Sequence, residues 1–516
     1  MRSRGPASRA NGFREVLFCG ALAAVLSAAA FVAWGDIGLN PADEGFLWYG
    51  VISTAEGQVP MRDFESYEPA RYYWSALFGS DLLSVRLAGR VFQGFGLFFG
   101  LLAARRARLR PAWLVLVALI LWAWMFPRHK LFEPALAMMA VYATLRLLES
   151  PTARTHFWVG IYVGGAACFG RNHGFYAAMA SLLAMTLLVR LGTPDVLRRG
   201  VSWAAGVALG FAPLLAMCLL VPGFAEPWIE TVLFDFRPGT PFATPAPWPW
   251  NVDFSTGRLV HNLSVFSVGI APLLVFFGPL FGLGVAWLTR REQLQDRALL
   301  LAGSFVGLFY SHHAMAHSDV YHFAQAIHPA LLLWCAIPRA FGFGERTLPS
   351  ALTWGFIALA SLLATSLFNS NLGRTLRIHP FPALIPFEAA GEALRLPAPS
   401  AVYFERMKRV LRRHVGDTDE LFIAPNRPVF YALLGKQSPV LDTYMLWHAP
   451  LERQDQIVKD LEEKDVHWAL ICDRVPAGRE FRNTHPRVWL HLTNSFEQIA
   501  DVDLPEDHRL LRRKRR

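Results

Sequence analysis

The chain reads Asn40-Pro41-Ala42-Asp43-Glu44-Gly45 shortly after its first long apolar run, residues 15–34. The same loop continues into Arg62-Asp63-Phe64-Glu65-Ser66-Tyr67-Glu68-Pro69-Ala70-Arg71-Tyr72-Tyr73-Trp74. If the apolar run crosses a membrane, two adjacent carboxylates at its edge are costly unless they are hydrated, paired or used. The acidic pair Asp43 and Glu44 therefore indicates a site at the membrane surface rather than a plain linker.

The composition predicts a polytopic membrane protein. Of the 516 residues 53% are hydrophobic and only 17% are charged, which is too apolar for one soluble domain. The net charge is +10, but Lys and Arg stand in short blocks between apolar runs. That pattern is typical of membrane topology and not of nucleic-acid binding. The five cysteines predict neither a disulfide framework nor a Cys-x-x-Cys metal site, because four of them lie in apolar runs.

Eleven apolar runs approach the length that crosses a bilayer, so we expect an α-helical fold with about eleven transmembrane helices. The first run follows basic residues, as in a signal peptide, but it lacks a clean small-x-small cleavage site. A retained helix is therefore predicted. The runs are 15–34, 82–103, 111–126, 133–148, 156–170, 174–190, 201–221, 263–288, 298–311, 323–338 and 351–368.

Basic residues orient these helices, because they fall in alternate loops. The positive-inside rule places those loops and the N-terminus in the cytoplasm of an inner (plasma) membrane protein. Two long loops, 36–80 and 222–262, then lie on the outer side. One basic cluster, Pro127-Arg128-His129-Lys130, also lies there against the rule, which suggests that an anionic group holds it. The cytoplasmic basic positions are 105–110, 146, 190, 198–199, 290–291, 339 and 346.

The composition changes after residue 369, where charged residues become dense and apolar runs shorten to strand length. We expect a transmembrane domain, residues 1–368, followed by a small extracytoplasmic (periplasmic) α/β domain, residues 369–516. The basic end, 512–516, is interpreted as a solvated tail, with an anionic lipid surface as the alternative. Helices are predicted at 402–413 and 451–464, and short buried strands at 421–424 and 468–472.

The unusual polar residues all fall in the predicted outer loops, where carboxylates and fixed cations could meet. An acceptor hydroxyl that attacks a sugar carbon needs a carboxylate base. A departing phosphate needs Arg or Lys donors, because charge accumulates on its oxygens. The chain carries no Gly-rich phosphate loop, and the outer compartment supplies no nucleotide sugars. A sugar donor built on a membrane lipid phosphate satisfies both conditions.

At this point the first outer loop resembles that of the GT-C membrane glycosyltransferases, in the protein O-mannosyltransferase and aminoarabinose-transferase-like branch. The resemblance rests on Pro41-Ala42-Asp43-Glu44, Gly57-Gln58-Val59-Pro60, Arg62-Asp63-Phe64 and 67–74. It extends to Gly170-Arg171-Asn172-His173-Gly174, to the helix count and to the C-terminal domain. These enzymes use polyprenyl-phosphate sugars as donors. The resemblance implies that Asp43 is the general base of an inverting displacement and that Glu44 orients the acceptor or supports the base.

The resemblance also implies a cationic grip on the lipid phosphate. Many relatives carry Lys-Pro-Pro where this chain reads Glu68-Pro69-Ala70, so the usual lysine is absent. Arg71, Arg128, Lys130 and Arg171 are the candidates to replace it. Each also has a plain interpretation, as an interfacial anchor or as the ion-pair partner of a carboxylate. The substrate-binding set, for lipid phosphate or sugar, is completed by Glu133, Asp319 and His322.

The stretch 311–322 is rich in histidine, which raises the question of a metal site. Its spacing matches no strong zinc pattern, so pocket-lining roles are favoured for Asp319 and His322. No metal or other cofactor is predicted, although a divalent cation remains an alternative.

Two other functions remain open from the sequence. A polytopic transporter or lipid flippase for a polyprenyl-linked or anionic substrate would line its path with similar polar groups. It would place them near the bilayer midplane, often beside broken helices or repeats. A non-catalytic assembly or sensor protein is the third alternative. The expected partners of the enzyme are a polyprenyl-phosphate sugar, an extracytoplasmic glycan, lipid or protein acceptor, and membrane lipids, but no nucleic acid.

Overall fold

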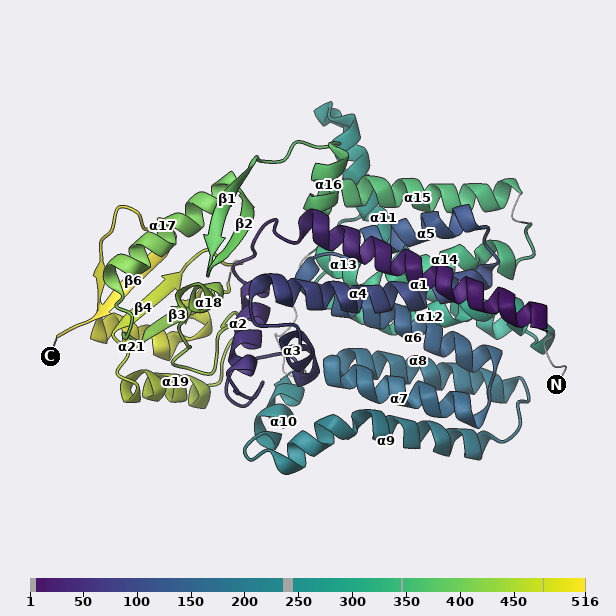
Figure 1. Cartoon of the computed structure of the whole chain (residues 1–516), viewed down its shortest axis with the longest axis horizontal. Coiled ribbons are helices and arrows are strands. Elements are labelled where there is room, and N and C mark those ends of the chain that lie inside the picture. The colour runs from purple at the N-terminus through teal and green to yellow at the C-terminus, as the bar shows by residue number, and fades with distance from the viewer. Residues whose placement is uncertain (1–5, 235–244, 345–346, 477, 516) are drawn as a thin grey trace. The chain divides into compact units, whose positions relative to one another are not determined.

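The computed structural model describes residues 6–234, 245–344, 347–476 and 478–515. Within these ranges the chain forms two compact units (Figure 1). The basic position 346 lies outside the described residues, and the predicted loop 222–262 and the basic tail lie partly outside them. The helical unit contains Met1–Trp34, Gly89–Ala216 and Pro241–Phe381, and the α/β unit contains Gly35–Ala88, Met217–Thr240 and Pro382–Arg516.

Long helices that run roughly side by side form the helical unit (Figure 1). The first residues of α4 belong to the α/β unit and the remainder to the helical unit. The helices are α1 (Pro6–Trp34), α4 (Leu82–Ala104), α5 (Pro111–Ala123), α6 (Phe132–Glu149), α7 (Ala153–Phe169), α8 (Arg171–Arg190), α9 (Val196–Leu220), α11 (Leu259–Leu288), α12 (Leu294–Ala316), α13 (Val320–Ala326), α14 (His328–Ala340), α15 (Leu348–Phe368) and α16 (Ser370–Leu376).

Ten of the eleven predicted runs each fall on one of these helices, and the run 323–338 covers parts of α13 and α14. In the described part of the chain, eight helices are long and apolar enough to cross a membrane. The pair α13 and α14 is bent by 55° and would count as a ninth span. The two remaining runs correspond to α5, with 13 residues, and α7, with 17 residues. The predicted class, a polytopic helical membrane fold, is confirmed.

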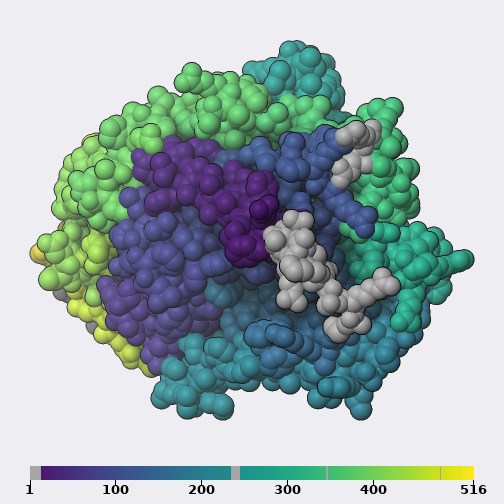
Figure 2. Space-filling model, turned by 45° about the vertical axis from the view of Figure 1, so that its right-hand side comes forward, coloured from purple at the N-terminus to yellow at the C-terminus, as the bar shows by residue number. Residues whose placement is uncertain are grey.

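Helix α9 meets α7 along a seam of glycines. Gly160 and Gly164 on α7 face Gly206 and Gly210 on α9, and a methyl group at any of the four would overlap backbone of the other helix. This is the small-xxx-small spacing that lets membrane helices approach closely. Only 11% of the apolar window of α9 is buried in the protein, so the seam is a major part of its packing. Helix α1 is similarly peripheral, with 22% buried, and Figure 2 shows it in purple at the surface.

The α/β unit is built on a four-stranded sheet in the order β3-β4-β6-β5. Its strands are β3 (Leu421–Ala424), β4 (Trp468–Cys472), β5 (Phe496–Ile499) and β6 (His508–Arg513). β3 pairs parallel with β4, and the other neighbours are antiparallel. In register, Leu470 lies opposite both Ile423 and Leu510. The two predicted strands are thus confirmed as β3 and β4.

Alternate residues of β3 and β4 face two separate cores, as the two-residue period of a strand requires. Leu421, Ile423 and Leu470 belong to one core, together with α17 (Ala398–His414). Phe422 and Ile471 belong to the other, together with α19 (Leu451–Glu463). The predicted helices at 402–413 and 451–464 are confirmed as α17 and α19. The unit also contains α2 (Asp43–Ala55), α3 (Pro69–Ala76), α10 (Ala225–Phe234), β1 (Leu384–Ala389), β2 (Glu392–Pro397), α18 (Val429–Leu434), α20 (Phe481–Thr484) and α21 (Pro486–Ser495).

Helix α2, in the first predicted outer loop, is part of the first of these cores. Leu47, Trp48 and Val51 are buried in it together with Phe430 of α18. Gly45 lies so close to α18 that a Cβ there would be 2.6 Å from the Cβ of Val429. Residues 35–88 therefore group with the C-terminal residues. Composition carries no information on such long-range packing, so the domain limits 1–368 and 369–516 remain a prediction.

Candidate functional site

The acidic pair lies in the first turn of α2. The Asn40 side-chain oxygen accepts hydrogen bonds from the backbone N–H groups of Ala42, at 2.9 Å, and Asp43, at 3.1 Å. This local turn starts the helix in the way that Asn commonly does. The positive end of the helix dipole favours a carboxylate in the first turn. Asp43 is half-buried.

Asp43 has a hydrogen-bond donor that comes from the C-terminal part of the chain. The Tyr444 hydroxyl donates to Oδ1 of Asp43 at 3.0 Å. Burial first, and then the negative charge of Asp43, raise the pKa of Tyr444 well above its ordinary value. Tyr444 therefore stays protonated at neutral pH and orients the carboxylate as a donor. The two residues are 401 positions apart in sequence, and no local signal marks Tyr444.

Glu44 points to a different partner and forms a buried ion pair with Arg86 of α4. Its oxygens accept from Arg86 Nε at 2.9 Å and Nη2 at 3.1 Å, and the two side chains are 3% and 4% exposed. Arg86 also donates to the carbonyls of Gly35 and Gly38. Removing one partner of such a pair leaves a buried charge uncompensated. Glu44 thus fastens the segment before α2, and Arg86 is a site residue that sequence analysis missed.

Glu65 holds the segment that carries Tyr444. Its Oε2 accepts the backbone N–H groups of Thr443 and Tyr444, both at 2.7 Å, and its own N–H donates to the Leu441 carbonyl. Burial, and then the charge of Asp442, raise the pKa of the Glu65 carboxyl to about 8. The first loop and residues 441–444 are therefore joined directly beside Asp43.

Tyr444, the donor to Asp43, belongs to a group of aromatic side chains that contact one another. Phe46 meets the rings of both Tyr67 and Tyr444 edge to face, at centroid distances of 5.3 and 5.6 Å. Trp447 lies 5.8 Å from Tyr444. Arg71, only 3% exposed, places its guanidinium 4.5 Å above the Tyr67 ring. A sugar ring can stack on such a wall, and the arginine supplies positive charge next to it.

The second group of predicted residues lies in the helical unit. Arg128 and Lys130 form the short helix η2 (Arg128–Lys130) directly before α6, and Glu133 is buried in the first turn of α6. Arg171 is the first residue of α8, which packs against α6. Three cations and one carboxylate are thus placed at the starts of two neighbouring helices.

Asp319 and His322 contact each other, and their predicted role as pocket-lining residues stays a prediction. Asp319 Oδ1 caps α13 by accepting the N–H groups of Tyr321 and His322, and it lies 2.9 Å from His322 Nδ1. Burial alone would raise the pKa of Asp319, but the hydrogen bond and charge of His322 outweigh it and lower that pKa. The His317 ring stacks on His322 at 4.5 Å, and its pKa is lowered to about 4 by burial and then by His322.

The histidine-rich helix α12 also makes contacts that sequence analysis did not assign. The Tyr310 hydroxyl lies 2.9 Å from His173 Nδ1, and His312 Nδ1 lies 2.9 Å from the Tyr176 hydroxyl. Their helices, α8 and α12, are thereby joined through polar groups. No three His, Cys, Asp or Glu side chains are grouped as metal ligands in the residues that the structure describes.

The predicted site residues thus fall into two groups. Asp43, Glu44 and Arg71 belong to the α/β unit, and the structure brings Asp43 to Tyr444 but binds Glu44 to Arg86. The helical unit holds Arg128, Lys130, Glu133, Arg171, Asp319 and His322.

No model of a known protein family matches the chain. No curated protein matches its sequence either. A solved structure, the crystal structure of ArnT from Cupriavidus metallidurans bound to undecaprenyl phosphate, is similar with a TM-score of 0.51 and 14% sequence identity. The match covers 96% of this chain and 97% of that one. At this identity the likeness is one of fold, and it extends over nearly the whole chain, in agreement with the polytopic helical fold predicted from its sequence.

Proposed function

We propose that this protein is an integral membrane glycosyltransferase that moves a sugar from a polyprenyl-phosphate donor to an extracytoplasmic glycan, lipid or protein acceptor. The observation that carries the proposal is the half-buried Asp43 at the start of α2, which accepts a hydrogen bond from Tyr444 next to the ring of Phe46. The full-length fold likeness to ArnT, whose crystal structure contains undecaprenyl phosphate, supports the choice of donor.

Asp43 acts as the general base in this proposal. It takes the proton of the acceptor hydroxyl as that oxygen bonds to the anomeric carbon of the sugar. The bond from this carbon to the phosphate oxygen breaks, and polyprenyl phosphate leaves with the electron pair. A single displacement inverts the anomeric centre. Tyr444 keeps the carboxylate aimed, and Glu44 acts through Arg86 by fixing the turn that carries Asp43.

Cations stabilise the leaving phosphate in the same scheme. Arg71, Arg128, Lys130 and Arg171 are the proposed donors, because charge-assisted hydrogen bonds to phosphate are stronger than neutral ones. Glu133, Asp319 and His322 line the donor site. The reaction needs no resident metal in this scheme, and transfer that survives EDTA would support that part of it.

The membrane orientation belongs to the proposal as well. The N-terminus is cytoplasmic, and the C-terminal domain is periplasmic at the inner (plasma) membrane. This orientation can be tested with single cysteines introduced into a variant that lacks the five native ones. An impermeant maleimide then labels the accessible cysteines in intact cells. Labelling at the exposed Val502 but not at the exposed Arg198 is the expected outcome. The reverse pattern would contradict it.

The direct experiment incubates purified protein with a panel of polyprenyl-phosphate sugars and measures donor consumption. Asp43→Asn is expected to lower the transfer rate by about 100- to 10,000-fold, the range that a general base contributes. Glu56→Gln is the matched control, because Glu56 is an exposed acid at the other end of α2 whose partner is Gln437. It should keep normal transfer. Near-normal transfer by Asp43→Asn would remove Asp43 from the mechanism, whereas wild-type protein inert with every donor would contradict the activity itself.

One observation favours the transporter or flippase alternative. Helices α13 and α14 are bent by 55° at a break near Ile327, and broken helices are common at transporter binding sites. Proteoliposomes with a fluorescent polyprenyl phosphate in one leaflet separate the two functions. Lipid movement across the bilayer without consumption of any sugar donor would favour the transporter.

A further inference from the structure

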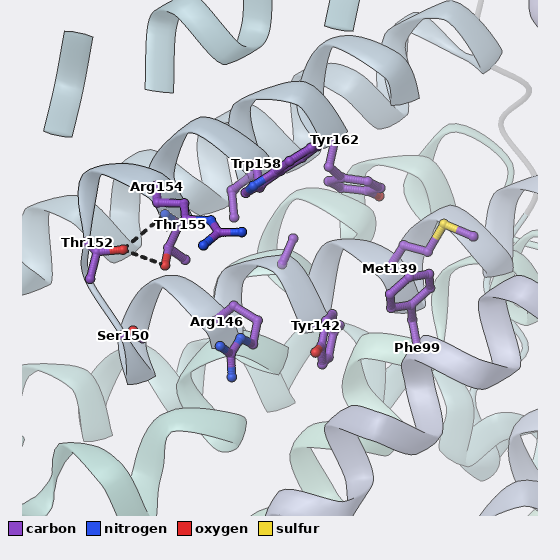
Figure 3. Close-up of a pocket in the computed structure, with 12 residues that line it drawn as sticks. Phe99, Met139, Tyr142, Arg146, Ser150, Thr152, Arg154, Thr155, Trp158 and Tyr162 are labelled. Carbon is purple, nitrogen blue, oxygen red and sulfur yellow. Dashed lines mark hydrogen bonds between the residues drawn. The ribbon is translucent and has the colours of Figure 1, made fainter. Parts of the chain in front are cut away.

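The described part of the helical unit contains a cavity of about 620 Å³ beside α4, α6 and α7 (Figure 3). Its lining is polar and basic at one end and apolar at the other. Figure 3 shows Ser150, Thr152, Arg154 and Thr155 at one end, and Phe99 and Met139 at the other. A cavity with a basic, hydroxyl-rich end and an apolar end fits an amphiphile with an anionic head.

Two arginines supply the charge at the polar end. Arg146 comes from the last turn of α6, and Arg154 comes from the first turn of α7. Arg146 forms an ion pair with Glu149, with 3.4 Å between Arg146 Nη1 and Glu149 Oε2. The exposed Arg154 makes no ion pair with any residue that the structure describes. The guanidinium of Arg154 is therefore available to an anion from outside the protein.

Hydroxyl groups and a helix start complete this end. The Thr152 hydroxyl accepts the N–H of Thr155 at 3.1 Å and lies 2.9 Å from the Thr155 hydroxyl. This cap begins α7, whose positive dipole end adds to the charge of Arg154.

The remaining lining is aromatic and apolar. Trp158, 58% exposed, follows Arg154 by one turn of α7, and Tyr142 packs against Phe99 at 5.2 Å. Tyr162 donates its hydroxyl to the Leu136 carbonyl at 2.6 Å and turns its ring to the cavity. Tryptophan and tyrosine of this kind mark the level of lipid headgroups.

The polar end of the cavity is separate from Glu133, the proposed donor-site residue on the same helix. Glu133 and Arg146 are thirteen residues apart on α6, which corresponds to about 20 Å along a helix. Arg146 also belongs to the basic blocks that the sequence places on the cytoplasmic side, where anionic lipids attract basic residues.

We propose that this cavity binds an anionic glycerophospholipid. The lipid phosphate lies between Arg146 and Arg154, and one acyl chain follows Met139, Tyr142 and Trp158. Bound lipid joins the end of α6 to the start of α7 and stabilises the helical unit. This site is independent of the proposed transferase reaction.

The test is photolabelling of the purified full-length protein in detergent. Phosphatidylglycerol with a diazirine in one acyl chain is the probe, and phosphatidylcholine with the same chain is its zwitterionic control. We expect phosphatidylglycerol to label peptides containing 139–146 and 154–162. The double variant Arg146→Gln with Arg154→Gln should bind about 30-fold more weakly, since each arginine contributes about 1 kcal/mol toward an anionic lipid.

Two further variants keep the test decisive. Arg198→Gln removes an exposed arginine of the same predicted side outside the cavity, and it should label like wild type. Ala143→Phe fills the cavity while both arginines remain, so it should also reduce labelling even if the double variant fails to fold.

The following outcomes would overturn the proposal. Equal labelling by the two lipids would show that the anionic head group is not recognised. Unchanged labelling of Ala143→Phe would show that the acyl chain does not lie in the cavity. Displacement by millimolar inorganic phosphate would identify a free-anion site. Stronger competition by undecaprenyl phosphate than by unlabelled phosphatidylglycerol would identify the carrier lipid as the occupant instead.

Discussion

The start of α2 and the polar end of the α6–α7 cavity both depend on arginine, but they differ in what the arginine contacts. Arg86 is buried, and it donates to a carboxylate and to two backbone carbonyls of its own unit. Arg154 is exposed, and its guanidinium makes no ion pair with the described residues. Burial with most N–H donors bonded within the protein indicates a role in holding the chain, whereas exposure beside a cavity leaves the donors to a ligand.

The same contrast separates the two neighbouring acids. Glu44 forms a buried ion pair with Arg86. Asp43 is half-buried and accepts a hydrogen bond from the Tyr444 hydroxyl, which a single substitution can remove. In the proposed function the two adjacent carboxylates therefore have different roles: Glu44 fixes the turn and Asp43 reacts, and the family resemblance also implies Asp43 as the base.

The largest effect is expected from Arg86→Met, because it leaves Glu44 buried without its cation. The free energy of unfolding should fall by about 3–5 kcal/mol. Thermal unfolding in detergent, followed by intrinsic fluorescence, measures it. The double variant Arg86→Met with Glu44→Leu should recover most of the loss, since neither buried charge remains. Equal destabilisation of the single and double variants would contradict the role assigned to the pair.

A pH-dependent effect is expected from Glu65, whose pKa is raised to about 8 from an ordinary value of 4.5. The folded state holds the proton more tightly than the unfolded state does. Its contribution to stability is therefore fully present below pH 4.5 and is lost as the pH rises toward 8. Glu65→Gln should reduce the fall in the free energy of unfolding between pH 5 and 8. The change in slope is at most about 1.4 kcal/mol per pH unit.

Unfolding of wild type and Glu65→Gln at pH 5, 6, 7 and 8 checks this prediction. In Asp442→Asn the fall in stability should occur at lower pH than in wild type, because the Asp442 charge is the second cause of the raised pKa of Glu65. Parallel curves for wild type and Glu65→Gln would show that Glu65 does not titrate in this range.

A smaller effect is expected from Tyr444→Phe, which removes the donor on Asp43. Since a hydrogen bond to a charged group contributes about 1.5 kcal/mol, the transfer rate should fall by about tenfold. Donor consumption measures it. Tyr73→Phe is the matched control, because Tyr73 is an exposed tyrosine of the same unit. The same loss in both variants would mean that the contact with Asp43 has no special role.

The smallest effect is expected from Arg154→Gln on stability in lipid-free detergent. An exposed side chain without an ion pair should change the free energy of unfolding by less than about 0.5 kcal/mol. A loss of stability as large as that of Arg86→Met would contradict the different roles assigned to the two arginines. Thermal unfolding under the conditions used for Arg86→Met provides the comparison.

The sequence predicts the elements of this fold better than their long-range partners. Apolar runs locate the helices because a membrane span needs a minimum apolar length, and strands β3 and β4 follow from short buried runs. The partners of the acidic pair lie 42 and 401 residues away, beyond the reach of any local pattern. One signal was available, since Arg86 interrupts an apolar run and a charge in that position calls for a partner.

The packing of α2 against α18 was not predictable for a related reason. A loop rich in polar and aromatic residues reads as exposed when it follows a membrane span. Its apolar side chains, among them Trp48 and Val51, are buried only because a domain encoded some 380 residues later covers them. Composition separates the two segments, whereas packing joins them.

The glycine seam between α7 and α9 has a mechanical consequence. One side of α7 is set by backbone contact with α9, at Gly160 and Gly164, where no side chain lies between the two helices. Its cavity side carries Arg154 and Trp158, which can change rotamer. Helix α7 is therefore held at backbone distance where it meets α9, whereas the side chains that line the cavity can adapt to different lipids.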